Sequence, residues 1–196
     1  MKIGIFGGSF NPIHTGHAIL VNYLACNTDL DTVWLMVAPQ NPLKSDYDHS
    51  YDLHRIRMTD MVARRFDNVI TSGFEFSLPH PSYTVDTLDA LSSKFPEDKF
   101  VLIIGADNWA SFERWKNPEK IISNYEIYIY PRKGFEIFIP ENLKSTVKAL
   151  NSPIIEISST IIRNKLQNGE NASFYLPDDV YDYILKHNLY IPNYGR

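Results

Sequence analysis

Short apolar runs alternate with segments of helical periodicity along most of the chain. The apolar runs have the length of buried strands and cover residues 2–6, 32–39, 68–76, 99–107, 125–131 and 152–158. Helical spacing of apolar positions marks residues 17–26, 50–66, 83–95 and 178–188. This alternation is typical of a parallel sheet that is covered by helices on both faces. The run at 99–107 is the most hydrophobic, so we expect that strand near the centre of the sheet.

The residues that flank these segments support an α/β fold class. Thr15 is the expected N-cap of the first helix, and Asn188 is the expected cap at the end of the last one. We expect a Rossmann-like, doubly wound parallel sheet in a single domain over residues 1–196, whose C-terminal part, 157–190, carries two helices. The residues expected on the apolar face of the 50–66 helix are Leu53, Ile56, Met61 and Val62.

The composition is that of a globular protein without a general nucleic-acid surface. The chain has 196 residues, of which 44% are hydrophobic and 21% charged, and its formal net charge is −4. Cys26 is the only cysteine, so no internal disulfide can form, and its apolar neighbours in sequence favour a small core residue. We expect no signal peptide and no membrane span, and therefore a cytoplasmic protein.

The stretch GGSFNPIHTGH, residues 7–17, indicates a phosphate site. Gly7 and Gly8 allow the backbone to turn and approach a ligand closely after the first strand. His14 and His17 then lie at the start of the following helix, where free N–H groups and the helix dipole favour an anion. The stretch matches neither the dinucleotide fingerprint nor the P-loop. No nearby acidic residue or cysteine completes a metal site with the two histidines, so we expect no metal held by the protein alone.

This stretch resembles the HxGH signature of the nucleotidyltransferase superfamily. The matching positions are Gly8, Phe10, Pro12, His14, Gly16 and His17. Members of this superfamily join a nucleotide monophosphate unit to a phosphate acceptor. The resemblance implies ATP contacts from the first loop and helix, which here are Gly7, Gly8, Ser9, Phe10, His14 and His17.

A second motif, ISSTIIRNKL at residues 157–166, also favours polyphosphate binding. Ser158 or Ser159 can cap a helix, Thr160 adds a hydroxyl, and Arg163 follows one turn later. An ordinary capped helix with a solvated arginine would have the same pattern. The superfamily carries this element at the same relative position, and the resemblance implies that it binds the triphosphate of the nucleotide.

Two further stretches resemble the bacterial nicotinate mononucleotide adenylyltransferases. These are SYTVDTL at residues 82–88 and GADNWASFERW at residues 105–115. The resemblance implies a nicotinate nucleotide site, formed by Tyr83, Thr84, Asp107 and Trp115. A tryptophan face can stack on a pyridinium ring, and helix N–H groups can hold a carboxylate. Trp109 is expected to have no ligand role.

Two basic residues complete the expected site. Many relatives have a Pro-Pro-His-Lys loop after the second strand, where this chain has QNPLK, with Leu43 in place of the histidine. Lys44 is therefore the expected phosphate ligand and is expected to bind the nicotinate nucleotide together with Tyr83, Thr84, Asp107 and Trp115. Arg132, in YPRKG after the fifth strand, is an expected ATP contact. His14, His17, Lys44 and Arg163 are the expected catalytic residues, with Mg²⁺ carried by the ATP phosphates.

The resemblance implies transfer of AMP from ATP to nicotinate mononucleotide, which gives deamido-NAD and pyrophosphate in NAD biosynthesis. The histidines are expected to act as positively charged donors to the phosphates. A sibling enzyme, such as pantetheine-phosphate adenylyltransferase or a cytidylyltransferase, and a non-catalytic nucleotide-binding module stay open as alternatives. A fragment of a class I aminoacyl-tRNA synthetase is disfavoured, because the chain is short and acidic. The sequence leaves the oligomeric state open, a homo-oligomer included.

Overall fold

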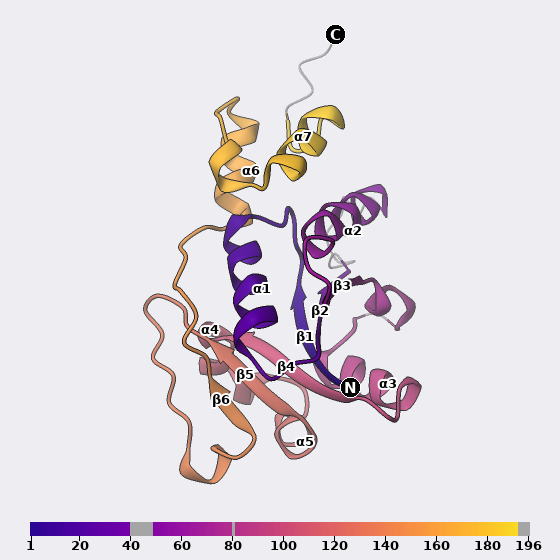
Figure 1. Ribbon diagram of the computed structural model, residues 1–196, viewed down its shortest axis with the longest axis vertical. Helices are drawn as coiled ribbons and strands as arrows, with labels where there is room; N and C mark the ends of the chain where they lie inside the picture. The colour runs from indigo at the N-terminus through magenta and orange to yellow at the C-terminus, as the bar shows by residue number, and fades with distance from the viewer. Residues whose placement is uncertain (40–48, 80, 192–196) are drawn as a thin grey trace.

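A parallel sheet runs through the computed structural model, which describes residues 1–39, 49–79 and 81–191 (Figure 1). The strands in this part of the chain are β1 (Lys2–Gly8), β2 (Thr32–Val37), β3 (Val69–Ser72), β4 (Lys99–Gly105), β5 (Glu126–Tyr130) and β6 (Val147–Ala149). Their order in the sheet is β3-β2-β1-β4-β5-β6, and every neighbouring pair is parallel. The order reverses between β1 and β4, which confirms the expected doubly wound sheet and places its topological switch point between these two strands.

Helices cover both faces of this sheet. They are α1 (Thr15–Asn27), α2 (His49–Ala63), α3 (Thr84–Lys94), α4 (Ala106–Ala110), α5 (Pro118–Asn124), α6 (Ser159–Gln167) and α7 (Asp178–Lys186). One core cluster joins α1, α2, α6 and α7 to one face of the sheet, and the other joins α3, α4 and α5 to the opposite face. Along β4, Val101 and Ile103 enter the first cluster, while Leu102 and Ile104 enter the second. No helix of the described residues is long and apolar enough to cross a membrane.

Two predicted strands differ from the structure. The predicted strand at 152–158 is wrong, because the sixth strand is β6, which pairs with Ile127–Ile129 of β5. Pro153 lacks the N–H that a ladder requires, and this segment forms neither strand nor helix on its way from β6 to α6. The predicted strand at 68–76 ends early at Ser72, and a short 3₁₀ helix follows at Phe74–Ser77.

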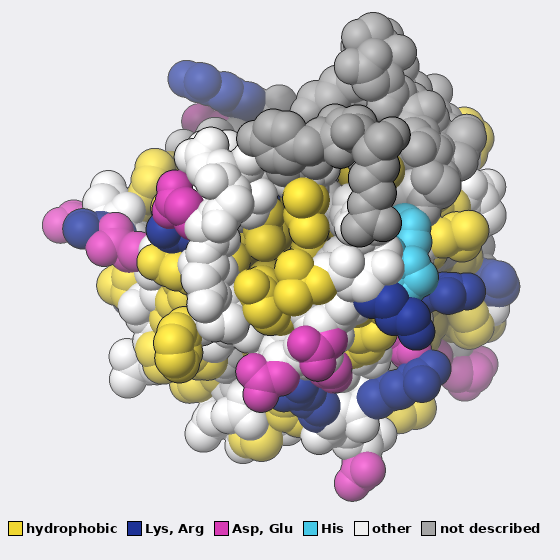
Figure 2. Space-filling model, turned by 90° about the horizontal axis from the view of Figure 1, so that it is seen from above, with side chains coloured by type: hydrophobic (Ala, Val, Ile, Leu, Met, Phe, Trp, Pro, Cys, Tyr) yellow, Lys and Arg dark blue, Asp and Glu magenta, His cyan; other side chains and the backbone are white. Residues whose placement is uncertain are grey.

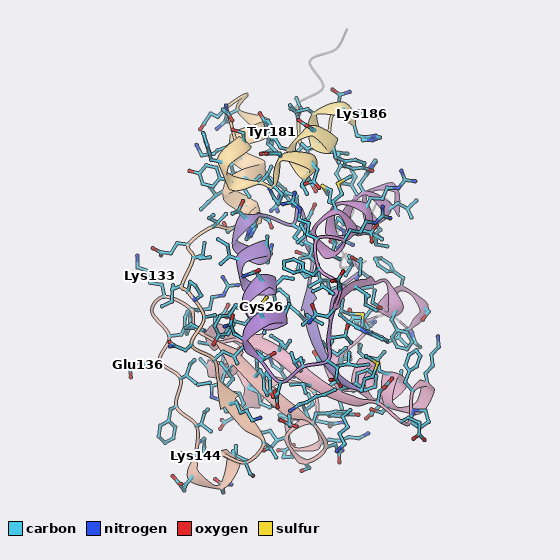
Figure 3. All side chains as sticks on the ribbon, in the orientation of Figure 1. Cys26, Lys133, Glu136, Lys144, Tyr181 and Lys186 are labelled. Carbon is cyan, nitrogen blue, oxygen red and sulfur yellow. The ribbon has the colours of Figure 1, made fainter. Side chains whose placement is uncertain are left out.

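Two predictions of buried residues are also wrong. Leu53 is 63% exposed, because several of the residues that α2 turns toward the core are polar. The buried residues on that face include Asp52, Arg55 and Thr59. Cys26 is exposed near the end of α1, where Figure 3 labels it. A hydrophobic neighbour in sequence does not set which side of a helix faces the core.

The segment between β5 and β6 stands away from the sheet as a long connection. Figure 3 labels Lys133, Glu136 and Lys144 along it. It begins with Pro131 and Arg132, directly after the carboxyl end of β5. Loops at the carboxyl ends of parallel strands surround the ligand sites of such sheets, so this connection starts beside the expected ligand site.

Candidate active site

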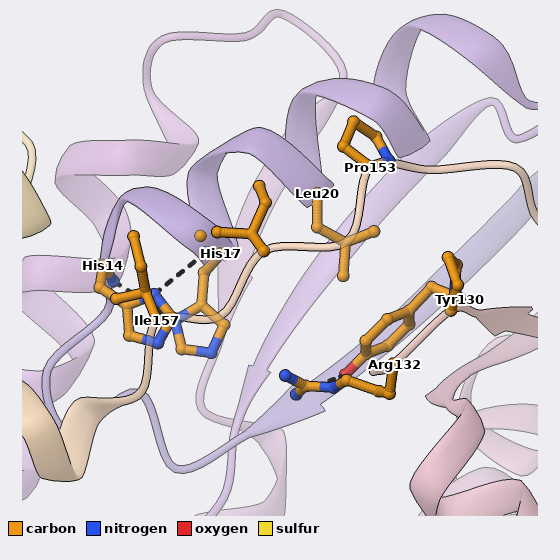
Figure 4. Close-up of a pocket in the computed structure, with 10 residues that line it drawn as sticks. His14, His17, Leu20, Tyr130, Arg132, Pro153 and Ile157 are labelled. Atoms are coloured by element: carbon orange, nitrogen blue, oxygen red, sulfur yellow. Dashed lines mark hydrogen bonds between the residues drawn. The ribbon is translucent and has the colours of Figure 1, made fainter. Parts of the chain in front are cut away.

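Two histidines cap helix α1 reciprocally. His14 is the N-cap residue, and its Nδ1 accepts the backbone N–H of His17 at 3.3 Å. The Nδ1 of His17 accepts the backbone N–H of His14, also at 3.3 Å. Thr15 was the predicted N-cap, which is wrong because Thr15 is already the first helical residue. The two rings lie side by side in Figure 4, with their centroids 3.7 Å apart.

The hydrogen bonds and the burial of these rings decide their protonation. Since each Nδ1 accepts a hydrogen bond, the proton of each neutral ring lies on Nε2. Burial, and then the charge of Arg132, lower the pKa of His14 to about 4. Burial lowers the pKa of His17 below its usual value, and His14 and Arg132 lower it further. Both shifts favour the neutral form of these rings at pH 7, in contrast to the positively charged donors expected from the sequence.

The two sequence motifs meet in space. The Ser159 hydroxyl donates to the carbonyl oxygen of Pro12 at 2.9 Å. Arg163 donates through Nη1 to the carbonyl oxygen of Asn11 at 2.7 Å. Its Nη2 donates to the Thr160 hydroxyl at 3.2 Å. The start of α6 thus lies directly against the turn that leads to His14, as expected for parts of one site.

The turn after β1 begins later than predicted. Gly7 and Gly8 belong to β1, and Gly8 is paired with Val37 of β2. The chain turns at Phe10, whose φ is +43°, a left-handed value that is uncommon for a residue other than glycine. The Phe10 side chain is 1% exposed and lies against the His17 ring, with centroids 5.1 Å apart. Phe10, a predicted ATP contact, is therefore buried as a whole residue, and its side chain supports His17.

A narrow pocket lies in front of the two histidines (Figure 4). Tyr130 and Arg132 form its opposite wall, and Arg132 Nη2 donates to the Tyr130 hydroxyl at 3.2 Å. The remaining wall comes from Gly16, Leu20, Pro131, Pro153, Ile155 and Ile157. Its volume is about 30 Å³, which holds little more than a water molecule. The pocket therefore suits one small group of a ligand rather than a whole nucleotide.

A larger cavity, of about 300 Å³, lies between the ends of β1 and β4 and the start of α3. Trp115 and Thr84 line it on one side, and Gly7, Gly8 and Tyr130 on the other. The volume lies at the lower end of the range for small-molecule sites. We call this space the tryptophan cavity. It brings Trp115 and Thr84, two of the predicted pyridine contacts, to the same wall.

Tyr83 lies at the outer edge of the tryptophan cavity. It is the N-cap residue of α3, and no side chain caps that helix end. Together with Thr84 and Trp115 it lines an adjoining hollow of about 270 Å³. The Lys116 ammonium lies 4.6 Å from the centre of the Tyr83 ring and pairs with Asp86 at 2.8 Å. The free N–H groups at this helix end are suited to a carboxylate.

Asp107 and Arg132 border another cavity, of about 350 Å³, with Ser158 and Ile161 of α6 and the segment 154–157. We call it the arginine cavity. Asp107 Oδ1 lies 3.7 Å from Arg132 Nε, and neither atom has a hydrogen-bond partner among the described residues. Asp107 was predicted beside Tyr83, Thr84 and Trp115, but it lines the arginine cavity instead. Its neighbour Asn108 lines the tryptophan cavity.

Close packing holds Asp107 in this position. A Cβ atom on Gly105 would lie 2.3 Å from Asp107 Oδ1 and 3.2 Å from Arg132 Cγ. Only glycine at residue 105 therefore leaves room for the Asp107 carboxylate beside β5. At the other wall, the Ser158 hydroxyl accepts the Ile161 N–H at 3.3 Å and caps α6, which confirms one of the two predicted caps.

Several functional residues were missed or fall outside the description. Tyr130 borders both the narrow pocket and the tryptophan cavity, and the apolar run that contains it indicated only a strand. The wall formed by residues 153–157 was misread as a strand for the same reason. Lys44, the predicted phosphate ligand, lies outside the described residues. Within the part of the chain that is described, no three His, Cys, Asp or Glu side chains are grouped to hold a metal ion.

The narrow pocket shares wall residues with each of the two large cavities. Tyr130 is a wall of both the narrow pocket and the tryptophan cavity. Arg132 is a wall of both the narrow pocket and the arginine cavity. Seen from above, Lys and Arg side chains gather beside a histidine surface on an otherwise mixed face (Figure 2). The arrangement can hold two ligands that meet in front of His14 and His17.

Known proteins match the chain over almost its whole length. The cytidylyltransferase-like family model matches residues 5–165. A probable nicotinate-nucleotide adenylyltransferase of Bacteroides thetaiotaomicron is 47% identical over 94% of this chain and 91% of its own length. The Flavobacterium johnsoniae protein of that name is 44% identical over 97% and 99% of the two chains.

A solved structure has the same fold. The Plasmodium falciparum nicotinic acid mononucleotide adenylyltransferase complexed with NaAD superposes with a TM-score of 0.76. The match covers 96% of this chain and 97% of that one, with 23% sequence identity. By its sequence relatives, this chain belongs to the cytidylyltransferase-like family and, within it, to the nicotinate-nucleotide adenylyltransferases.

Proposed function

We propose that this chain transfers AMP from ATP to nicotinate mononucleotide, releasing pyrophosphate and forming deamido-NAD for NAD biosynthesis. The observation that carries the proposal is the narrow histidine pocket, which shares Tyr130 with one ligand-sized cavity and Arg132 with another. A reaction that joins two nucleotides through their phosphates requires two such sites and one meeting point.

The nicotinate nucleotide fits the tryptophan cavity. Trp115 offers an aromatic face for the pyridinium ring, whose positive charge favours stacking on indole. The uncapped start of α3, at Tyr83 and Thr84, offers N–H groups for the carboxylate. The phosphate then extends along Gly7 and Gly8 toward the histidines.

ATP fits the arginine cavity and the start of α6. The Asp107 side chain is 41% exposed and suits a ribose hydroxyl as a hydrogen-bond acceptor, and Arg132 suits a phosphate. Ser158, Ser159, Thr160 and Arg163 are proposed to hold the triphosphate. Lys44 is proposed to neutralise a phosphate from its loop, and Mg²⁺ enters as part of the Mg-ATP substrate.

The reaction is a direct in-line displacement. A phosphate oxygen of nicotinate mononucleotide attacks the α-phosphorus of ATP, and the bond from that phosphorus to the bridging oxygen of the β-phosphate breaks. Pyrophosphate leaves with the bonding electrons, and no protein nucleophile is required. His14 and His17 donate neutral Nε2–H bonds to the oxygens on which charge develops. Preorganised donors of this kind stabilise the transition state without first having to reorient.

The test is a substrate panel with product identification. Pyrophosphate release is measured with ATP or CTP, each paired with nicotinate mononucleotide, nicotinamide mononucleotide or phosphopantetheine. We expect the fastest release with ATP and nicotinate mononucleotide, with deamido-NAD identified by mass spectrometry. Faster turnover of CTP or of phosphopantetheine would assign the chain to a sibling activity. Nucleotide binding without any release would leave a non-catalytic module.

A further inference from the structure

A charged side chain is fully buried behind the site. Arg55 of α2 is 1% exposed and is among the largest fully buried side chains of the described residues. One of its nitrogens, Nη2, pairs with Asp52 at 2.5 Å. Its Nε has no hydrogen-bond partner among the described residues. A buried ion pair contributes little to stability compared with apolar packing of the same volume. Stability therefore does not explain why a charged residue is buried at position 55.

The other end of this guanidinium holds two strand ends together. Nη1 of Arg55 donates to the carbonyl oxygen of Ser9 at 2.5 Å and to that of Ala38 at 2.7 Å. Ser9 is the first residue after β1, and Ala38 is the first after β2. The Ala38 N–H donates in turn to the carbonyl oxygen of Gly8 at 2.9 Å. One nitrogen of Arg55 thus ties together the carboxyl ends of two adjacent strands.

These backbone groups form a wall of the site. Gly7, Gly8 and Ala38 line the tryptophan cavity, and Ser9 leads into the turn at Phe10. Carbonyl oxygens repel phosphate, so a wall that faces a phosphate must direct its carbonyls elsewhere. Arg55 draws two of them toward itself. Because C=O and N–H point in opposite directions across a trans peptide, the Phe10 N–H points away from the guanidinium.

The turn itself requires support. Phe10 holds φ at +43°, a conformation that is costly for a residue other than glycine and persists only where its surroundings enforce it. Arg163 holds the Asn11 carbonyl from α6, and Arg55 holds the Ser9 carbonyl from α2. The backbone is therefore held on both sides of Phe10, four residues before His14.

We propose that Arg55 is a positioning residue for adenylyl transfer. It holds the Ser9 and Ala38 carbonyls away from the substrate phosphates and fixes the turn that places His14 and His17. It touches no substrate itself. The inference rests on the proposed function, because it concerns the alignment of the same two histidines.

The experiment compares Arg55→Lys with Met58→Ala on the same helix. Lysine keeps the charge but cannot reach Asp52 and both carbonyls with one planar group. Met58 is fully buried, and its side chain has no donor that could hold the Ser9 or Ala38 carbonyl. Its truncation should therefore lower stability without releasing the turn. The measurements are kcat, both KM values and the backbone amide NMR signals of Gly8, Phe10 and Asn11, at a temperature where all variants are folded.

We expect Arg55→Lys to lower kcat by about 10- to 100-fold, as for a small misplacement of catalytic groups, and to shift the three amide signals. Met58→Ala should lower the melting temperature and leave kcat and the three amide signals unchanged. An Arg55→Lys enzyme with wild-type kcat and unmoved signals overturns the positioning role alone. Equal losses of kcat in both variants also overturn it, since they assign the effect to stability. A wild-type protein that makes no deamido-NAD overturns the proposed function instead. A shift of the amide signals in Arg55→Lys would then show a change of the turn without any link to catalysis.

Discussion

The imidazoles of His14 and His17 each accept the backbone N–H of the other residue, with their rings stacked 3.7 Å apart. One pair of side chains thereby performs two tasks. The Nδ1 atoms cap helix α1, and the Nε2–H groups remain for a ligand. The two tasks can be separated by substitution, because they use different atoms of the same ring.

His14→Asn should keep the helix cap and lose the donor. Asparagine is among the best N-cap residues, so the free energy of unfolding should stay close to that of wild type. The loss of one preorganised donor should lower kcat by about 10²–10³-fold. His14→Ala should show the same kinetic loss and about 1 kcal/mol less stability, from the missing cap. Denaturant unfolding and steady-state kinetics measure the two effects, and a His14→Asn enzyme within tenfold of wild type would argue against the donor.

Acidification should destabilise the fold through the same histidine. The pKa of His14 is lowered to about 4 by burial and by Arg132, so the unfolded chain, with a histidine pKa of about 6.5, binds the proton more readily. The stabilising contribution of neutral His14 is complete above pH 6.5 and is lost as the pH falls toward 4. The slope is at most about 1.4 kcal/mol per pH unit for each such histidine. Urea unfolding between about pH 7.5 and 5 should show this loss, and His14→Asn should reduce it. An equal slope in both proteins would contradict the lowered pKa.

Arg163→Ala should impair ATP use more than pyridine nucleotide use. Charged hydrogen bonds contribute about 1.5–3 kcal/mol, so kcat/KM for ATP should fall about 10- to 100-fold. Lys165→Ala is the matched control, because Lys165 lies on the same helix and pairs with Glu170 at 2.7 Å. Titrations with each substrate at saturating concentrations of the other separate the effects. Unchanged ATP kinetics would remove Arg163 from the triphosphate site.

Trp115→Ala should raise KM for nicotinate mononucleotide about tenfold and leave KM for ATP nearly unchanged. Aromatic stacking contributes about 0.5–1.5 kcal/mol beyond the burial of area, and Trp115 lines the tryptophan cavity. Trp109→Phe is the control, since the Trp109 indole donates to the Phe138 carbonyl at 2.9 Å. If both variants raise the pyridine nucleotide KM equally, packing rather than stacking explains the result.

Nicotinate mononucleotide should be preferred over nicotinamide mononucleotide by roughly 10- to 100-fold in kcat/KM. The α3 dipole favours a carboxylate by about 0.3–1 kcal/mol, and an amide NH₂ facing N–H donors costs about 1–3 kcal/mol. Lys116 neutralises the negative charge of Asp86 in the first turn of α3. Lys116→Met should reduce this preference, because the unpaired Asp86 would repel the nicotinate carboxylate. Lys120→Met, which frees Asp89 at a later turn, should not. Equal use of the two nucleotides by the wild-type enzyme would place the carboxylate elsewhere.

Features that depend on neighbouring residues could be predicted from the amino-acid sequence. Alternating apolar runs and helical periods predicted the parallel sheet with helices on both faces, because these periods follow from local backbone geometry. The cap at Ser158 was predictable for the same reason. Asn188, the expected cap of the last helix, is the left-handed residue with φ of +49° that follows the actual C-cap, His187. The resemblance of two short motifs indicated the family before any distance was known.

Contacts between residues far apart in the chain could not be predicted in this way, because they form when the elements pack together. The contact of Ser159 with Pro12 joins positions 147 residues apart, and no local pattern contains it. Arg55 appeared as one polar residue of an ordinary helix, and packing alone buried it between two strand ends. The charge state of His14 depends on burial and on Arg132, which comes from another strand's end. Periodicity specifies which face of an element is apolar, whereas burial, protonation and the sharing of walls between cavities arise only when the elements pack together.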